Sequence, residues 1–229
     1  ICKEAIIWQG LKHELVLPFF GVDKEIFAPA ISLVSPWMNE GTVLAYLGRH
    51  GREDVPRFTR EVAEALAYLH ASKVVHGDLR GANILISNVS PHHALLADFG
   101  LASVIRDEDA DLVGGALTSS SHAGNIRWWA PELCSPAQFG FPKFVRTPEV
   151  DAWAFGWVCC ELVTGEIPFA EMNEVQAMRE VIAGHRPERP EGMGIDVWEI
   201  VCAVWAEKAD ARPCMAEIAS WLREVQACN

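Results

Sequence analysis

Residues 76–86 read HGDLRGANILI and place a polar loop between two short apolar runs. The run before the loop, at 74–75, and the run that ends it, at 84–86, are rich in β-branched side chains, which is typical of short buried strands. Strands at both ends fix a loop in space, so Asp78 and Asn83 can converge on one point. Asp78 can accept a proton there, and Asn83 can offer an oxygen to a hard cation. The alternative is a turn rich in Asp and Asn that carries no chemistry.

Composition limits the class of protein. Half of the 229 residues are apolar, so the chain can bury a sizeable core and should be globular. The formal net charge of −12 excludes nucleic acid and anionic membranes as partners of the whole surface. The longest apolar run, residues 152–163, is about 12 residues long, which is too short to span a bilayer and predicts a buried helix. Cys159 and Cys160 lie in that run, and no CxxC occurs, which indicates reduced thiols and a cytoplasmic location.

The first part of the chain predicts a short mixed segment. It should contain a helix over residues 2–12 and two strands, over 15–20 and 31–35, which a turn separates. Helices are then predicted around residues 42–47 and 57–70. The second of these helices has apolar residues spaced for one buried stripe. The stripe consists of Phe58, Val62, Ala65, Leu66 and Leu69.

The second part predicts a mainly helical body. A strand at 94–97 leads to Asp98, and residues 103–127 have the composition of a long, mobile segment. Most of the remaining chain should be helical. Two of its helices should bury stripes, which are Val175, Met178 and Ile182 in one and Val197, Ile200, Val201 and Val204 in the other. The loop at 76–83 and Asp98 therefore lie at the junction of the two parts, where ligand sites are common.

Asp98 is the second carboxylate of a predicted site. It follows a strand and precedes Phe-Gly, so a strand end holds it. With Asp78 and Asn83 it forms a set of two anionic oxygen ligands and one neutral ligand. Such a set suits magnesium, which binds one or two carboxylates together with phosphate oxygens. DFG alone is weak evidence, but DFG about 20 residues after HGDxxxxN is a strong signal.

These motifs and three later ones resemble a eukaryotic-type protein kinase. HGDLRGAN resembles the catalytic loop HRDLKxxxN, and residues 98–100 match DFG. Residues 130–132 match the APE that closes the activation segment, and residues 151–156 resemble the DxWxxG helix. Arg212 stands where the family keeps an arginine that pairs with the glutamate of APE, which is Glu132 here.

The resemblance implies an α+β fold of the protein-kinase type. Residues 1–38 would be the remnant of a mixed N-terminal lobe, with its αC helix, last strands and hinge. Residues 39–229 would be a mainly helical C-terminal lobe that carries the catalytic loop and the activation segment. The resemblance also implies ATP and Mg²⁺ as cofactors and a protein as substrate, whereas the oligomeric state is left open.

The resemblance gives the polar residues of the loop specific roles. Asp78 would be the catalytic base or would orient the substrate hydroxyl, and Asn83 and Asp98 would be the magnesium ligands. Arg80 takes the place of the usual lysine and keeps a positive charge near the γ-phosphate. Its planar fork replaces a point charge, so the rate should be altered.

Four further residues are expected to contact the nucleotide or its partners. Glu4 resembles the helix glutamate that pairs with the ATP-contacting lysine. The segment ISLVSPWM resembles the last strand and the hinge, so Pro36 would offer its C=O to adenine and Met38 a backbone contact. Leu85 would lie beneath the adenine ring, or it is an ordinary strand leucine.

The sequence departs from the family pattern in two further ways. It starts after the position of the glycine-rich loop and the ATP-contacting lysine, so weak ATP binding is expected. Gly77 replaces the arginine that grips a phosphorylated activation segment in the family. Phosphorylation of Thr118 or of Ser119–Ser121 is therefore not expected to be the main activating step.

The acceptor and the class of substrate leave alternatives. GNIRWWAPE resembles the tyrosine-kinase-like serine/threonine group, and DLRGAN has some likeness to the tyrosine-kinase loop, so Ser/Thr is favoured. One alternative is a small-molecule phosphotransferase of the aminoglycoside type, in which HGDxxxxN with glycine is typical. Another is a pseudokinase that keeps the fold and binds protein partners without catalysis.

Overall fold

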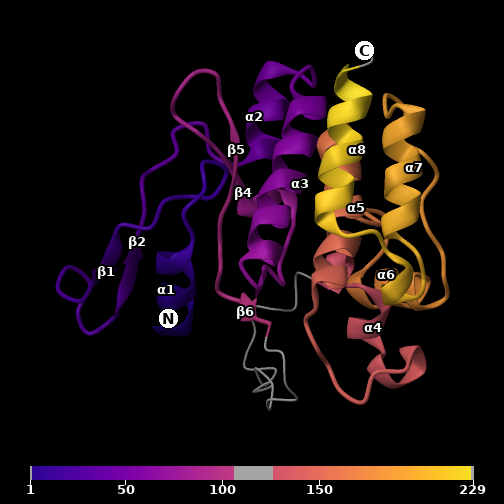
Figure 1. The fold of residues 1–229 in the computed structure, drawn as a ribbon, viewed down its shortest axis with the longest axis horizontal. Helices are drawn as coiled ribbons and strands as arrows, with labels where there is room; N and C mark the ends of the chain where they lie inside the picture. The colour runs from indigo at the N-terminus through magenta and orange to yellow at the C-terminus, as the bar shows by residue number, and fades with distance from the viewer. Residues whose placement is uncertain (1, 106–125, 228–229) are drawn as a thin grey trace.

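A computed structural model describes residues 2–105 and 126–227. A small part with α1, β1 and β2 lies at one end, and the helical body lies at the other (Figure 1). Short strands β3 to β6 stand between them. The helices are α1 (Cys2–Gly10), α2 (Val43–His50), α3 (Val55–Ala71), α4 (Pro131–Cys134), α5 (Pro148–Thr164), α6 (Glu174–Ile182), α7 (Ile195–Val204) and α8 (Met215–Ala227). This is the α+β class that the sequence predicts.

The strands form three separate antiparallel pairs, and short 3₁₀ helices connect several elements. The strands are β1 (Gly21–Asp23), β2 (Ser32–Val34), β3 (Val74–Val75), β4 (Ile84–Ile86), β5 (Ala94–Leu96) and β6 (Ser103–Val104). The 3₁₀ helices are η1 (Gly81–Asn83), η2 (Ile126–Trp128), η3 (Pro136–Phe139) and η4 (Ala209–Ala211). β1 pairs with β2, β3 with β6 and β4 with β5. The polar loop therefore leaves one ribbon and enters another, which fixes both of its ends.

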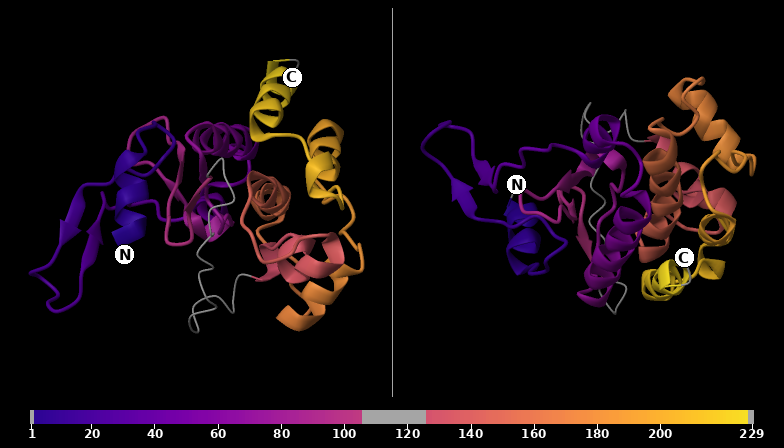
Figure 2. Two further views of the ribbon diagram at one scale, coloured as in Figure 1. Left: turned by 60° about the horizontal axis from the view of Figure 1, so that its bottom comes forward. Right: turned by 90° about the horizontal axis from the view of Figure 1, so that it is seen from above.

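The central element of the body is α5, which lies between α3 and α7 (Figure 2). Its apolar side chains occur on all sides of the helix, and Trp153, Phe155 and Trp157 are almost completely buried. The buried helix predicted for residues 152–163 is confirmed, and its two cysteines are buried free thiols. The predicted stripe of α3 is also confirmed, because all five of its residues are fully buried. α8 packs along α3 and completes the core.

The predicted strand at residues 15–20 is wrong. Leu15 and Leu17 bond to Leu96 of β5 through backbone hydrogen bonds of 2.9 and 2.8 Å, and Phe20 donates to the C=O of Val34 in β2 at 2.9 Å. Pro18 lies between them and has no N–H to donate, so the pairing with β5 stops there and no continuous strand forms. The first strand instead begins at Gly21, inside the predicted turn.

The predicted stripe of α6 is also wrong. Val175 is 54% exposed, and the fully buried residues are Ala177 and Val181, which face α4 and η2. The stripe of α7 is confirmed for three of its four residues, Ile200, Val201 and Val204. Of the segment predicted to be mobile, residues 103–104 form β6, which corrects that part. The phosphorylation sites considered at residues 118–121 lie outside the described residues.

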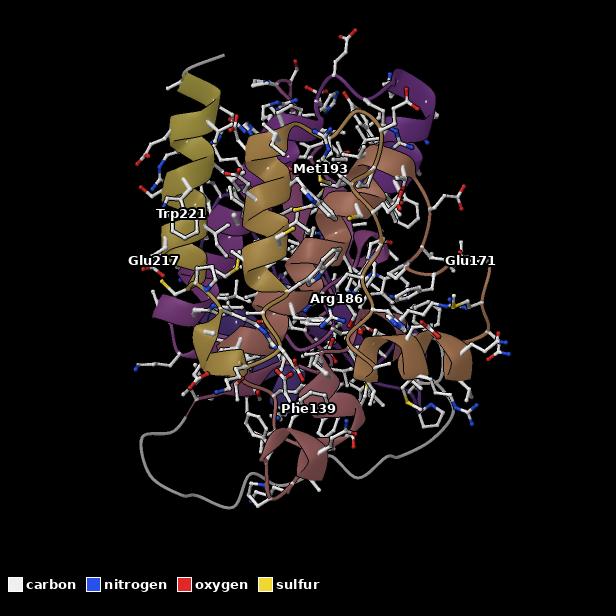
Figure 3. The ribbon with its side chains drawn as sticks, turned by 90° about the vertical axis from the view of Figure 1, so that its right-hand side faces the viewer. Phe139, Glu171, Arg186, Met193, Glu217 and Trp221 are labelled. Carbon is white, nitrogen blue, oxygen red and sulfur yellow. The ribbon has the colours of Figure 1, made fainter. Side chains whose placement is uncertain are left out.

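The face at the right of Figure 1 is formed mainly by α6, α7 and α8 (Figure 3). Glu217 and Trp221 lie on α8. Arg186, which follows α6, places its guanidinium 4.2 Å from the centre of the buried Trp153 ring, and Arg212 lies 4.9 Å from the same ring. Burial, and then the neighbouring Arg212, lower the pKa of Arg186 to about 10.

Within residues 2–105 and 126–227, no helix has the length and apolar character needed to cross a membrane.

Candidate functional site

The catalytic loop is attached to α5 through the buried carboxylate of Asp151. Its two oxygens accept the backbone N–H groups of His76 and Gly77, each at 2.8 Å. His70 of α3 adds a contact of 2.9 Å from Nε2. Burial alone would raise the pKa of Asp151, but the bonds and charges of His70, His76 and Gly77 outweigh burial and hold it below its ordinary value. The start of the loop is therefore fixed to the rigid core.

A second carboxylate of α5, Glu161, holds the other half of the loop. It accepts the N–H of Gly81 at 2.9 Å and the indole Nε1–H of Trp128 at 2.8 Å. Burial raises the pKa of Glu161 to about 7, although these two bonds and the charge of Arg80 oppose the shift. One buried group thus joins the loop to the segment that leads into α4.

Asp78 and Asn83 face each other, as the sequence predicts. The Asn83 amide donates to the backbone O of Asp78 at 2.8 Å and to its carboxylate Oδ2 at 3.1 Å. The Asp78 N–H points to Nδ1 of His76 at 3.3 Å, and Nε2 of that ring contacts the C=O of Ala97 at 3.0 Å. Partial burial is the main cause of the raised pKa of Asp78. His76 and Arg80 oppose it, and Asp98 adds to it.

Asp98 leaves β5 in a left-handed conformation, with φ of 62°. Its Oδ1 accepts the N–H of Gly100 at 3.2 Å. Phe99 turns inward and is fully buried, with its ring 5.7 Å from that of Trp8 on α1 and 5.5 Å from that of His76. The turn therefore exposes the Asp98 carboxylate while its neighbour joins α1 to the loop.

Glu4 brings a third carboxylate to this place. Burial raises the pKa of Glu4, and the charge of Asp98 raises it further. Asp98 thus acts on the pKa values of both Glu4 and Asp78, which come from α1 and the loop. The result is a local excess of negative charge that favours a bound cation.

The donor chemistry of this place fits magnesium. Carboxylate and amide oxygens of Asp98 and Asn83 are of the kind that Mg²⁺ takes, together with phosphate oxygens and water. In the part of the chain that the structure describes, no cluster of three or more His, Cys, Asp or Glu side chains could hold a metal ion. A metal bound here would therefore depend on ligands from the nucleotide and water.

Arg80 follows Asp78 by two positions, and its side chain lies near Trp128. Its guanidinium is 5.6 Å from the centre of the Trp128 ring, and its charge acts on both Asp78 and Glu161. Its buried Nε has no hydrogen-bond partner in the described chain. A small pocket beside Asp78 is lined by Trp128, Trp129 and Leu133, among others.

The residues predicted to contact adenine lie near β4. Leu85 on β4 is half-buried and forms an isolated bridge with Thr42, which follows the segment that contains Pro36 and Met38. Both Pro36 and Met38 are half-buried, and Met38 packs against the core. The structure therefore places these three residues in adjoining segments.

Three residues of the site were not predicted from the sequence. Asn88 anchors the predicted hinge, because its Nδ2 donates to the C=O of Trp37 at 2.7 Å and its Oδ1 accepts the N–H of Asn39 at 2.8 Å. Glu161 had a signal, since it is the one charged residue within the apolar run at 152–163. Arg146, which bonds to Gly77, lies between two motifs and had none.

The comparison with protein families agrees with these contacts. The family model described as protein tyrosine and serine/threonine kinase matches residues 1–222. The match covers both parts of the fold and confirms the resemblance of the sequence to a eukaryotic-type protein kinase. Members of this family are protein kinases that generally use ATP and Mg²⁺. The chain therefore belongs to the protein tyrosine and serine/threonine kinase family.

Proposed function

We propose that this chain transfers the γ-phosphate of ATP to Ser or Thr hydroxyls of protein substrates. The observation that carries the proposal is the convergence of Asp78, Asn83 and Asp98, on segments whose ends are fixed. Asp151 and Glu161 bind the loop to the core helix, which holds Asp78 and Asn83 in place before substrate arrives. Preorganised groups of this kind are what phosphoryl transfer requires, because positioning and electrostatics supply most of the rate.

Each polar residue has a role in this proposal. Asp78 orients the substrate hydroxyl and accepts its proton, and the amide of Asn83 keeps the carboxylate in one orientation. Arg80 places a positive charge beside the transferred group. Asn83 and Asp98 are the residues that would hold Mg²⁺, which when bound supplies charge that neutralises the ATP phosphates.

The nucleotide would lie between the two parts of the chain. In this proposal Pro36, Met38 and Leu85 contact the adenine. Glu4 lies on the side of the phosphates, near Asp98. The division into an N-terminal part at residues 1–38 and a C-terminal part at 39–229 belongs to the same proposal.

Two observations support a protein as substrate and Ser/Thr as acceptor. Glu132 of the APE motif is held by Arg212 in a buried ion pair, which makes the segment after Trp128 and Trp129 rigid. A rigid surface beside Asp78 suits the docking of a peptide. The sequence GNIRWWAPE, which resembles the tyrosine-kinase-like group, favours Ser or Thr.

Ligand binding can be tested by thermal shift with Mg²⁺, ATP and both together. No GxGxxG occurs in the 229 residues, so ATP should be titrated to millimolar concentration. We expect Mg²⁺ and ATP together to raise the melting temperature more than either alone. Asp98→Asn should abolish the additional rise, whereas Asp210→Asn on η4 is the control and should keep it. Absence of any rise would contradict the proposal and favour the pseudokinase alternative.

Transfer itself can be measured with labelled ATP and a pool of Ser, Thr and Tyr peptides. Labelled phosphoserine and phosphothreonine are expected, and Asp78→Asn should remove the label while binding of Mg²⁺ and ATP persists. Label on tyrosine alone would overturn the acceptor assignment. Label on an aminoglycoside but on no peptide would support the small-molecule alternative.

A further inference from the structure

Gly77 is the second residue of the catalytic loop, and the side chain of another residue fills the space beside it. Its φ is +76°, in the left-handed region. A Cβ placed on Gly77 would lie 2.5 Å from Cδ and 3.0 Å from Nε of Arg146. The arginine comes from the segment between η3 and α5. Its side chain therefore occupies the space that a side chain at position 77 would need.

Arg146 also bonds to the loop. Its Nε–H donates to the backbone C=O of Gly77 at 3.2 Å. Its guanidinium lies 4.9 Å from the centre of the Phe144 ring, which in turn contacts the Trp129 ring edge-on at 5.5 Å. These contacts fix the direction of the arginine side chain.

Two carboxylates act on this buried arginine. Burial lowers the pKa of Arg146, and the charges of Asp78 and Asp151 offset only part of that shift. The positive charge of Arg146 therefore interacts with the negative charges of Asp78 and Asp151.

The bonded carbonyl belongs to the peptide group that joins Gly77 to Asp78. Asp151 holds the N–H of Gly77 from one side, and Arg146 holds its C=O from the other. We infer that Arg146 is a positioning residue for Asp78. The arginine fixes the Gly77–Asp78 peptide and brings a positive charge to the loop from a distant segment. The inference rests on the proposed function of Asp78.

The contacts by which Arg146 and Asp151 hold Gly77 need no phosphate group. All of the residues involved, which are Arg146, Gly77, Phe144 and Asp151, belong to the folded chain itself. The loop should therefore be held in the same geometry whether or not residues 118–121 are phosphorylated.

A double-mutant cycle of Gly77→Ala and Arg146→Ala tests the shared volume. The positive φ and a distance of 3.1 Å from the new Cβ to the backbone O of Leu101 penalise alanine at position 77 in both backgrounds. The closest clash, at 2.5 Å from Cδ of Arg146, exists only with Arg146 present. We expect Gly77→Ala to lower the melting temperature by about 3 °C more in the wild-type chain than in the chain that already carries Arg146→Ala. Additive effects would overturn the inference, and this readout does not depend on phosphotransfer.

The chain offers a matched control at Gly165, which has φ of +81° and ends α5. A Cβ there would lie 2.5 Å from Nη2 of Arg52, whose Nη1 donates to the C=O of Leu162 at 2.9 Å. Arg52→Gln therefore removes a similar arginine to carbonyl contact away from Asp78. It serves as the control for all effects on the loop.

The positioning role has two further readouts. With Arg146→Gln, the amide NMR signals of Gly77 and Asp78 should shift and the Gly77 amide should exchange faster, whereas Arg52→Gln should leave them unchanged.

In transfer assays Arg146→Gln should lower kcat about tenfold or more with KM values nearly unchanged, and Arg146→Lys should restore most of the lost kcat. Unchanged loop signals, or a kcat equal to that of Arg52→Gln, would overturn the inference. If the wild type transfers no phosphate, the proposed function fails. The NMR measurement still tests whether Arg146 positions the loop, because it does not depend on phosphotransfer.

Discussion

Arg212 and Glu132 form a two-pronged ion pair in the interior of the helical body. Nη1 lies 2.6 Å from Oε1 and Nη2 lies 2.8 Å from Oε2, and both side chains are almost completely buried. Arg212 also donates to the backbone C=O groups of Glu149 and Ala206. The pair therefore joins α4 to the start of α5 and to the segment after α7.

Removal of one partner should destabilise the protein strongly. Glu132→Gln would leave Arg212 buried and next to Arg186 without a compensating charge. We expect a loss of about 3–5 kcal/mol in the free energy of unfolding, measured by urea denaturation. Glu40→Gln is the control, because its pair with Arg49 is solvent-exposed, and it should leave the midpoint unchanged. Equal effects of the two substitutions would contradict this prediction.

Glu161 should make the stability depend on pH between about 4.5 and 7. Its pKa rises from an ordinary value of 4.5 to about 7 in the folded state, so the folded chain keeps a proton that the unfolded chain releases. The stabilisation is complete below pH 4.5 and is lost as the pH rises to about 7, and it amounts to about 3 kcal/mol. Glu161→Gln should flatten this part of the profile. Glu191→Gln, on an exposed loop, should keep the profile of the wild type.

Two helical glycines should respond in opposite ways to alanine. On α5, a Cβ at Gly156 would lie 2.6 Å from Nε1 of Trp205 and 3.0 Å from Cγ2 of Val204, so Gly156→Ala should force the helices apart. We expect it to lower the free energy of unfolding by about 1–3 kcal/mol. On α2, nothing lies within 4 Å of a Cβ at Gly48. Gly48→Ala should stabilise by about 0.5–1 kcal/mol, and thermal unfolding of both variants checks the difference in sign.

Asp98→Asn should stabilise the protein in the absence of ligands. Asp98 raises the pKa values of Glu4 and Asp78, which means that the three carboxylates repel one another. Asparagine has nearly the same shape and tolerates the left-handed backbone, so only the charge is lost. We expect a melting temperature higher by about 1–3 °C without Mg²⁺. Asp23→Asn in β1 is the control, and a lower melting temperature for Asp98→Asn would contradict the expected repulsion.

The sequence predicted much of the site because its motifs are local. The contact between Asp78 and Asn83 follows from a five-residue spacing within one short loop. The buried stripe of α3 and the all-round apolar α5 follow from helical periodicity, and both are confirmed. The pairing of Arg212 with Glu132 followed from the family resemblance, because 80 residues separate them.

The failed predictions concern pairing and orientation. The apolar run at residues 15–20 has the composition of a strand, but Pro18 interrupts it, so Leu17 bonds to β5 and Phe20 to β2. In α6 the apolar residues at 175, 178 and 182 have helical spacing, yet α4 and η2 select the neighbouring face with Ala177. A short helix has several faces of similar polarity, so the surface against which it packs decides which one is buried.

The sequence by itself determined the order of the motifs, the core helices and the chemical identity of the loop residues, since these depend on side chains close together in the chain. Only the tertiary structure decided how the loop is held. Asp151 and Glu161 reach it from α5, and Arg146 fills the space that Gly77 leaves. Such contacts arise when distant segments pack into one volume, where burial makes each hydrogen bond and charge stronger than it would be in water.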